Sequence, residues 1–131
     1  MHRKLNSWLQ PGGHIELNED PQQALERELI EEVGLWPDQY DFLGEDSQPH
    51  PRKGKTVRMP IHLSVHHVTD GHQHIDFTYL IKSKTDKLIP AEGESTQIGW
   101  FSREDILDLH SKGQVFDNIL DICEWIFDTN S

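Results

Sequence analysis

The spacing of three glutamates could allow their carboxylates to bind cations together: Glu28, Glu31 and Glu32. At 3.6 residues per helical turn, positions i, i+3 and i+4 share one face, so their carboxylates should lie close together. Clustered like charges repel, and many acidic clusters are only solvated helix faces. Hard divalent cations, however, need several oxygen ligands, and a helix with three carboxylates beside the Gly12-Gly13 turn supplies them. The spacing alone leaves both interpretations open.

A helix must bring these carboxylates together, and the sequence marks both of its ends. Asp20 followed by Pro21 predicts an N-cap and a first helical position. Gly34 is predicted to end the helix in a left-handed conformation. Between these ends the apolar residues recur at helical spacing: Ala24, Leu25, Leu29 and Val33.

A longer pattern surrounds the carboxylates. From Gly13 the chain continues with Glu19, Arg27-Glu28-Leu29, Glu31-Glu32 and Gly34-Leu35. These residues fill every specified position of the Nudix box, G-x5-E-x7-R-E-U-x-E-E-x-G-U, in which U is aliphatic. Residues 8–13 look like the usual lead-in to that box. The chain therefore resembles the Nudix hydrolase family.

The resemblance implies an α/β (α+β) fold, an α/β/α sandwich with a mixed sheet, in which a loop-helix-loop carries the box. It implies metal-dependent cleavage of the diphosphate linkage of a nucleoside diphosphate derivative: a nucleoside triphosphate, ADP-ribose or a nucleotide sugar. Divalent cations neutralise the charge of phosphate oxygens and lower the pKa of a bound water molecule, which then attacks phosphorus.

Site residues follow from the resemblance position by position. The implied ligands of Mg2+ or Mn2+ are the backbone carbonyl of Gly12 and the carboxylates of Glu28, Glu31 and Glu32. Arg27 and Glu19 are implied to pair and to brace the loop against the helix.

The general base differs among family members. Glu31 or Glu32 within the box is one candidate. Glu94, six residues before Trp100, is another, because its spacing resembles the loop glutamate of the bacterial 8-oxo-dGTP pyrophosphohydrolase. Glu94 also lies in a polar loop where surface glutamates are common. The candidate catalytic residues are therefore Arg27, Glu31, Glu32 and Glu94.

A hairpin is predicted in the second half of the chain. Apolar residues alternate along 56–68, Asp70-Gly71 favours a tight turn, and a second strand should continue over 72–81. A two-residue turn predicts three cross-strand pairs: Thr69 with His72, His67 with His74, and Val65 with Asp76.

The second hairpin strand carries residues that could do chemistry. His72, His74 and Asp76 alternate and therefore share one strand face, where they could bind a metal. A wet hairpin end covered by polar side chains is the alternative. We take His74 and Asp76 as candidate substrate contacts, and His14, directly after Gly13, could approach a phosphate.

The remaining elements are short. Strands are predicted at 7–10 and 98–101, and residues 102–105 resemble a capping box that opens a brief helix through Leu109. An apolar stripe over 116–127 predicts a final helix. Helices should therefore pack on a largely antiparallel or mixed sheet.

Composition limits the partners. The 131 residues suit one domain, 1–131, and the excess of 23 Asp and Glu over 12 Lys and Arg gives a net charge of −11. This charge repels polyanions, so we expect a small nucleotide substrate and no nucleic-acid polymer. No apolar run suits a membrane or a signal peptide, so we expect a cytoplasmic protein without a membrane partner.

The box begins early in the chain. Nudix domains normally place about two strands before it, so we expect an N-terminally truncated domain that lacks the first strands. A second copy in a homodimer could instead complete the sheet, because unpaired strand edges invite pairing. The rival function is a non-catalytic Nudix-like module that binds nucleotides. The intact set of Glu28, Glu31 and Glu32 favours chemistry.

Overall fold

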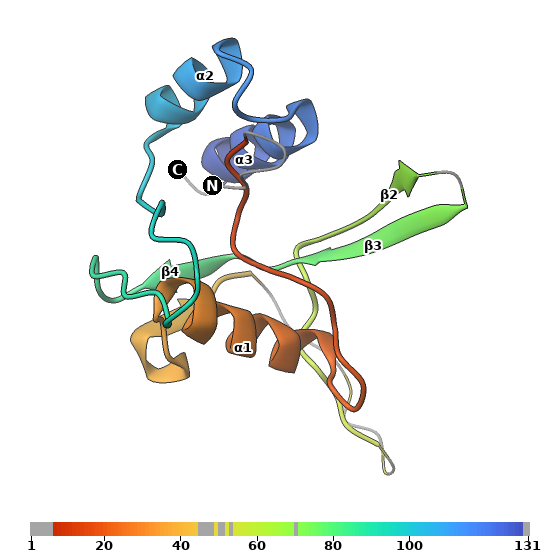
Figure 1. Ribbon diagram of the computed structural model, residues 1–131. Coiled ribbons are helices and arrows are strands. Elements are labelled where there is room, and N and C mark those ends of the chain that lie inside the picture. Colours follow the sequence, from red (N-terminus) through yellow and green to blue (C-terminus); the bar gives the residue numbers. More distant parts are fainter. Residues whose placement is uncertain (1–6, 45–48, 50–51, 53, 70, 130–131) are drawn as a thin grey trace.

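The computed structural model describes residues 7–44, 49, 52, 54–69 and 71–129. Figure 1 shows α2 and α3 side by side at one end, α1 beside β4 at the other, and the β2–β3 hairpin extending away from both. Two expectations concern parts of the chain outside the described residues: the N-terminal truncation and Asp70 of the predicted turn. The elements in chain order are α1 (Pro21–Val33), the 3-10 helix η1 (Pro37–Gln39), β1 (Tyr40–Phe42), β2 (His62–Thr69), β3 (His72–Thr78), β4 (Ile81–Ser83), α2 (Arg103–Ser111) and α3 (Asp117–Thr129).

Helix α1 has the ends that the sequence predicts. The Asp20 carboxylate accepts a hydrogen bond from the Gln23 backbone N–H at 2.8 Å, and the Gln23 side chain accepts one from the Asp20 N–H at 3.0 Å. Gly34 ends the helix with a φ of 72°. A Cβ at Gly34 would collide with the Ile89 backbone, so both the conformation and the packing require glycine.

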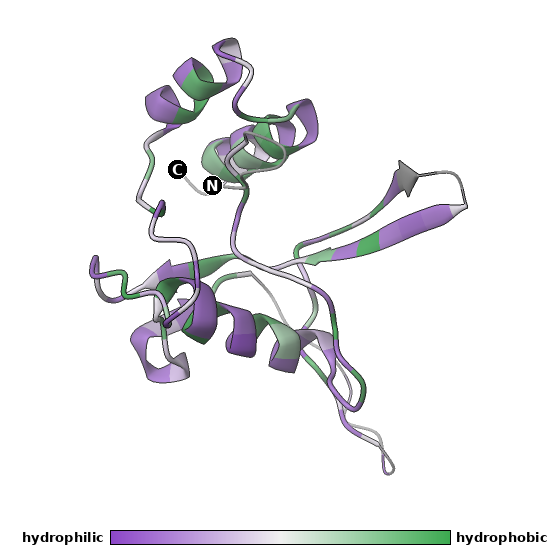
Figure 2. Ribbon diagram, in the orientation of Figure 1, coloured by the Kyte–Doolittle hydropathy of each residue, from purple (hydrophilic) through white to green (hydrophobic). Residues whose placement is uncertain are grey.

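The apolar stripe of α1 builds the core. Its partner is the antiparallel β1–β4 sheet, in which Tyr40 pairs with Ser83 and Phe42 with Ile81. Hydrophilic and hydrophobic residues alternate along α1 in Figure 2, as expected for a helix with one face packed inward. The buried cluster consists of Leu29, Val33, Leu35 and Tyr40, with Leu25, Phe42, Ile81, Leu88 and Ile98 packed against it.

The β2–β3 hairpin has a register that differs from the predicted one. Thr69 does pair with His72, but His74 pairs with His66 rather than His67. Asp76 likewise pairs with Ser64 instead of Val65. The cause is an irregularity between His67 and Thr69, where β2 contains one more residue than β3. The cross-strand pairs on the apolar face are Leu63 with Phe77 and Val65 with Ile75.

The predicted mixed sheet does not form among the described residues, whose strands make two separate two-stranded antiparallel sheets. The strands predicted at 7–10 and 98–101 are also wrong, apart from an isolated bridge at Ser7. The backbone at Trp8 lies beside a loop instead of a strand, because the Trp8 N–H donates to the Gln114 carbonyl at 2.8 Å. The rings of Trp8 and Phe101 pack edge to face at 4.9 Å.

The two C-terminal helices pack together. The Ser102 hydroxyl caps α2 by accepting from the Asp105 N–H at 3.1 Å, as predicted, and the helix continues beyond Leu109 to Ser111. Arg103 joins α2 to α3 because its Nη2 lies 3.2 Å from Glu124 and 3.0 Å from Asp128. No described helix combines the length and the apolar character needed to cross a membrane.

Candidate functional site

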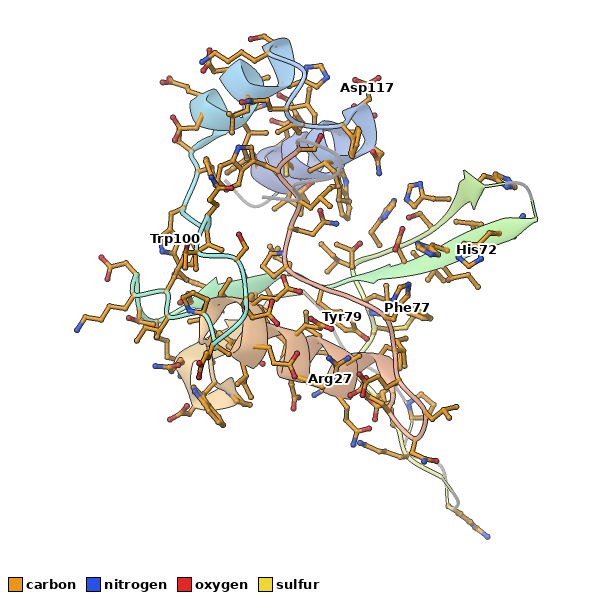
Figure 3. All side chains as sticks on the ribbon, in the orientation of Figure 1. Arg27, His72, Phe77, Tyr79, Trp100 and Asp117 are labelled. Atoms are coloured by element: carbon orange, nitrogen blue, oxygen red, sulfur yellow. The ribbon has the colours of Figure 1, made fainter. Side chains whose placement is uncertain are left out.

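Arg27 ties the loop before α1 to the helix (Figure 3). Its Nε and Nη2 donate to the two carboxylate oxygens of Glu19 at 2.9 and 3.1 Å, and Nη2 also donates to the His14 carbonyl at 3.0 Å. Hydrogen bonding to Glu19 raises the pKa of Arg27, while the same contact lowers the pKa of Glu19. The structure therefore contains the brace between Arg27 and Glu19 that the resemblance implies.

Arg27 also fixes the first carboxylate of the cluster. Its Nη1 donates to Glu28 Oε1 at 2.8 Å, and the Glu28 side chain is only 14% exposed. A Cβ at Gly13 would overlap the Glu28 carboxylate. The absence of a side chain at Gly13 therefore allows the loop to approach the helix closely.

Glu32 lies between Glu28 and the glycine turn. Its Oε1 accepts a hydrogen bond from the Gly12 N–H at 3.4 Å, and the side chain is half-buried. Burial, followed by the hydrogen bond and the charge of Glu28, raises the pKa of Glu32 to about 8. Without a cation, the half-buried Glu32 carboxyl therefore favours its neutral form more than a solvated carboxyl does.

A segment after β4 brings Glu94 toward this cluster. The Ile89 N–H donates to the Val33 carbonyl at 2.9 Å, and the Ala91 N–H donates to the Glu31 carbonyl at 2.8 Å. These bonds align the segment with the end of α1. The negative charge of exposed Glu94 contributes to the raised pKa of Glu32. Two of the candidate bases, Glu32 and Glu94, therefore interact electrostatically.

Glu31 occupies the outer side of the cluster. Its Oε2 accepts from Arg27 Nη1 at 3.4 Å, and its side chain is 44% exposed. Glu31 is therefore more accessible to solvent than Glu28.

The hairpin reaches the box loop through His74. The rings of His74 and His14 meet edge to face at 5.3 Å. Asp76 has a different partner, because its Oδ2 lies 3.0 Å from His66 Nε2 on the neighbouring strand. The Ser64 hydroxyl lies 3.1 Å from the same His66 nitrogen. Of the two candidate substrate contacts, His74 touches the loop, whereas Asp76 is paired within the hairpin.

Comparison with known proteins assigns the family. The model of the NUDIX domain matches residues 1–119. The chain belongs to the NUDIX family. The box over 13–35 and the contacts of Arg27 described above lie within the matched part of the chain.

Two curated relatives are similar to this NUDIX chain. The RNA pyrophosphohydrolase of Marinomonas sp. (strain MWYL1) is 50% identical over 40 residues, which cover 30% of this chain and 25% of that protein. The RNA pyrophosphohydrolase of Hydrogenovibrio crunogenus is 34% identical over 99 residues, which cover 72% of this chain and 57% of that protein. The chain thus spans less than two thirds of the length of either relative.

A solved structure agrees with this family. The crystal structure of a NUDIX family hydrolase from Clostridium perfringens matches with a TM-score of 0.76 and 30% sequence identity, covering 99% of this chain and 86% of that one. The likeness supports an α+β NUDIX fold for the arrangement of helices and small antiparallel sheets.

The donors at the glycine turn fit Mg2+ or Mn2+, which prefer oxygen ligands. The fit rests on the oxygen donors that meet at this turn: Glu32 contacts the Gly12 backbone at 3.4 Å, and the Glu28 carboxylate lies against Gly13. A bound cation would favour the ionised form of Glu32, whose pKa is raised. Among the residues that the structure describes, no three acidic or histidine side chains already surround one point. Glu31 faces Arg27, and the ligand role of the Gly12 carbonyl stays a prediction.

Two contacts at the site were not predicted from the sequence. His66 holds Asp76, and His14 touches His74. The first contact follows only from the correct hairpin register, since the predicted register places Val65 opposite Asp76. The second joins residues far apart in the chain, and the position of His14 next to Gly13 was its one local signal.

Proposed function

We propose that this NUDIX protein is a Mg2+- or Mn2+-dependent pyrophosphohydrolase that cleaves the diphosphate linkage of a nucleoside diphosphate derivative. The observation that carries the proposal is the arrangement of the carboxylates at the Gly12 turn. Glu32 accepts a hydrogen bond from the Gly12 N–H at 3.4 Å beside Glu28, whose carboxylate Arg27 holds at 2.8 Å. The candidate substrates are nucleoside triphosphates, ADP-ribose and nucleotide sugars, and the products are a nucleoside monophosphate and a second phosphorylated compound.

The cations would be held by the Gly12 carbonyl and by the carboxylates of Glu28, Glu31 and Glu32. When bound, they supply charge neutralisation for the phosphate oxygens and acidify a water molecule. Arg27 positions Glu28 through the 2.8 Å hydrogen bond from Nη1 and keeps the loop against the helix.

The proton of the attacking water needs an acceptor. Glu32 with a pKa of about 8 holds its own proton at neutral pH, so its use as a base requires added positive charge nearby. Glu31 within the box is a further candidate. Glu94 on the adjacent loop is the third, and its exposed carboxylate can reach solvent. His74 remains a candidate contact for the substrate because it touches the box loop.

RNA that carries a pyrophosphate linkage is a second candidate substrate. Both curated relatives are named RNA pyrophosphohydrolases. The net charge of −11 predicted that nucleic-acid polymers would be excluded, but these names do not support that exclusion. The bond to be broken is of the same chemical class, so the same carboxylates would serve both substrates.

A hydrolysis panel tests the proposed function. It contains ADP-ribose, 8-oxo-dGTP, ordinary nucleoside triphosphates, nucleotide sugars, diadenosine polyphosphates and RNA with a terminal triphosphate, each with Mg2+ or Mn2+ and with EDTA. We expect metal-dependent product from at least one compound. A folded protein that binds one of these compounds and hydrolyses none would contradict the proposal and would favour the non-catalytic nucleotide-binding module.

A further inference from the structure

The outer edge of β3 is open to another strand. Strands β2 and β3 form a two-stranded antiparallel sheet, and no other described strand pairs with either of them. Figure 1 shows this hairpin projecting beyond the helices. A two-stranded hairpin alone is marginally stable in water, and an unpaired edge offers backbone N–H and C=O groups for further pairing.

The two edges of the hairpin differ in shape and in charge. Strand β2 has the irregularity between His67 and Thr69, and such irregularities turn an edge away from further pairing. The sequence of β2, HLSVHHVT, contains histidines but no carboxylate. The sequence of β3, HQHIDFT, contains histidines and Asp76. Strand β3 therefore carries both groups that a charge pair between two identical strands requires.

The order of residues in β3 matches a two-fold axis through Ile75. Identical antiparallel strands related by such an axis pair residues symmetrically about one central residue. With Ile75 at the centre, Ile75 lies opposite itself, and His74 of each copy lies opposite Asp76 of the other. A centre on Asp76 would oppose two carboxylates, and a centre on His74 would place Ile75 opposite Gln73. The strand is therefore self-complementary about Ile75.

The side chains on both faces of β3 are compatible with this register. Asp76 Oδ2 lies 3.0 Å from His66 Nε2, and a carboxylate can accept further hydrogen bonds, so it can also accept one from a second imidazole. On the other face Ile75 is 61% exposed and Phe77 is 39% exposed. Figure 2 shows the alternation of hydrophilic and hydrophobic residues along β3. Pairing would cover the flank of exposed Ile75 with the same side chain of the second copy.

We propose that two copies of this chain join edge to edge through β3, centred on Ile75, and form a four-stranded antiparallel sheet. The net charge of −11 makes two copies repel each other, but β3 holds only one of the 23 acidic residues. The pairs of His74 with Asp76 of the second copy would lie beside the box loop, because the His74 ring contacts His14 at 5.3 Å. This interface does not depend on the proposed hydrolase function.

Two charge variants test the register, with sedimentation equilibrium of the whole chain at several concentrations. We expect the wild type to approach twice its mass of 15.2 kDa. His74→Glu should weaken the dimer at least about tenfold by opposing carboxylates, and Asp76→Lys should weaken it by opposing a lysine and an imidazole. An equimolar mixture of the two variants should dimerise again, since each carboxylate then faces an imidazole or a lysine. The control His67→Glu makes the same charge change at an exposed β2 position and should keep the wild-type dimer.

A disulfide crosslink tests the centre of the pairing independently. Opposite residues of antiparallel strands have Cα atoms about 4.5–5.5 Å apart, a distance that a disulfide spans. In a Cys123→Ser background, Ile75→Cys should give a covalent dimer under mild oxidation. Leu63→Cys, at an exposed position of the outer strand β2, should give none.

Circular dichroism checks that each variant is folded, and the exposure of Ile75 and Leu63 favours folding of both cysteine variants. Three results would each overturn the proposal. They are a wild type that stays monomeric at every concentration, a mixture of His74→Glu and Asp76→Lys that does not dimerise, and equal crosslinking of Ile75→Cys and Leu63→Cys.

Discussion

Glu32 and Glu28 share a hydrogen bond at the glycine turn in front of α1. Burial, followed by this hydrogen bond and by the charge of Glu28, raises the pKa of Glu32 to about 8. The helical spacing thus concentrates negative charge at a half-buried position. A divalent cation would relieve this charge, and this links the fold to the proposed chemistry.

Removal of divalent cations should make stability fall as pH rises. The pKa of Glu32 is about 8 in the folded chain and 4.5 as its ordinary value. The stabilisation from protonated Glu32 is therefore fully present below 4.5 and is lost as pH rises through about 8. Thermal unfolding in EDTA should show the Tm of the wild type declining relative to that of Glu32→Gln across this range. If the Tm of the wild type and that of Glu32→Gln changed with pH in parallel, the raised pKa of Glu32 would be contradicted.

Arg27→Lys should weaken both the fold and cation binding. Lysine keeps the charge but loses the fork that reaches both oxygens of Glu19 and also Glu28. We expect Tm to fall by a few degrees and Mn2+ to bind less tightly. Arg103→Lys, which changes the bridge from α2 to α3, is the control and should lower Tm alone. Equal Mn2+ affinity in all three proteins would argue against positioning of Glu28 by Arg27.

Glu94→Gln tests the loop base. If Glu94 accepts the proton, kcat should fall by more than about tenfold, or about 1.4 kcal/mol of barrier. Glu92→Gln, an exposed glutamate in the same loop, should keep the wild-type rate. The measurement is kcat over pH with saturating substrate and Mg2+. A smaller loss in Glu94→Gln would assign the base to Glu31 or Glu32 and leave Glu94 as a surface residue.

Gly13→Ala should reduce cation binding without unfolding the chain. The added methyl group would overlap the Glu28 carboxylate and displace it from Arg27. Gly99→Ala is the control, because a methyl group there would meet only the Phe101 ring at 3.8 Å. Mn2+ titration of both variants measures the effect. Unchanged Mn2+ affinity in Gly13→Ala would place the cation away from Glu28.

Local signals predicted the helix that carries the site. The cap at Asp20 and the left-handed Gly34 depend on a few neighbouring residues, and both are present in the structure. The spacing of the box likewise identified the partners Glu19 and Arg27, which lie within one loop and helix. Interactions of this range are encoded in residues close together in the chain.

Long-range pairing was less predictable. The hairpin register depends on the extra residue between His67 and Thr69, which the turn dipeptide does not encode. Residues 98–101 have a strand-like pattern but no strand partner among the described residues. The approach of Glu94 to Glu32 depends on the hydrogen bond from the Ala91 N–H to the Glu31 carbonyl, which joins segments that are far apart in the sequence.

The most direct test of a metal-dependent hydrolase is turnover by wild type and Glu32→Gln, side by side, on the best substrate of the panel. Glutamine keeps the side-chain volume but removes the charge that would hold the cation. We predict that kcat falls at least about a hundredfold, or about 2.7 kcal/mol of barrier, while the fold is retained. Glu26→Gln, which changes another glutamate of α1, should keep full activity. Wild-type turnover by Glu32→Gln, or wild-type turnover in EDTA, would contradict the proposed chemistry.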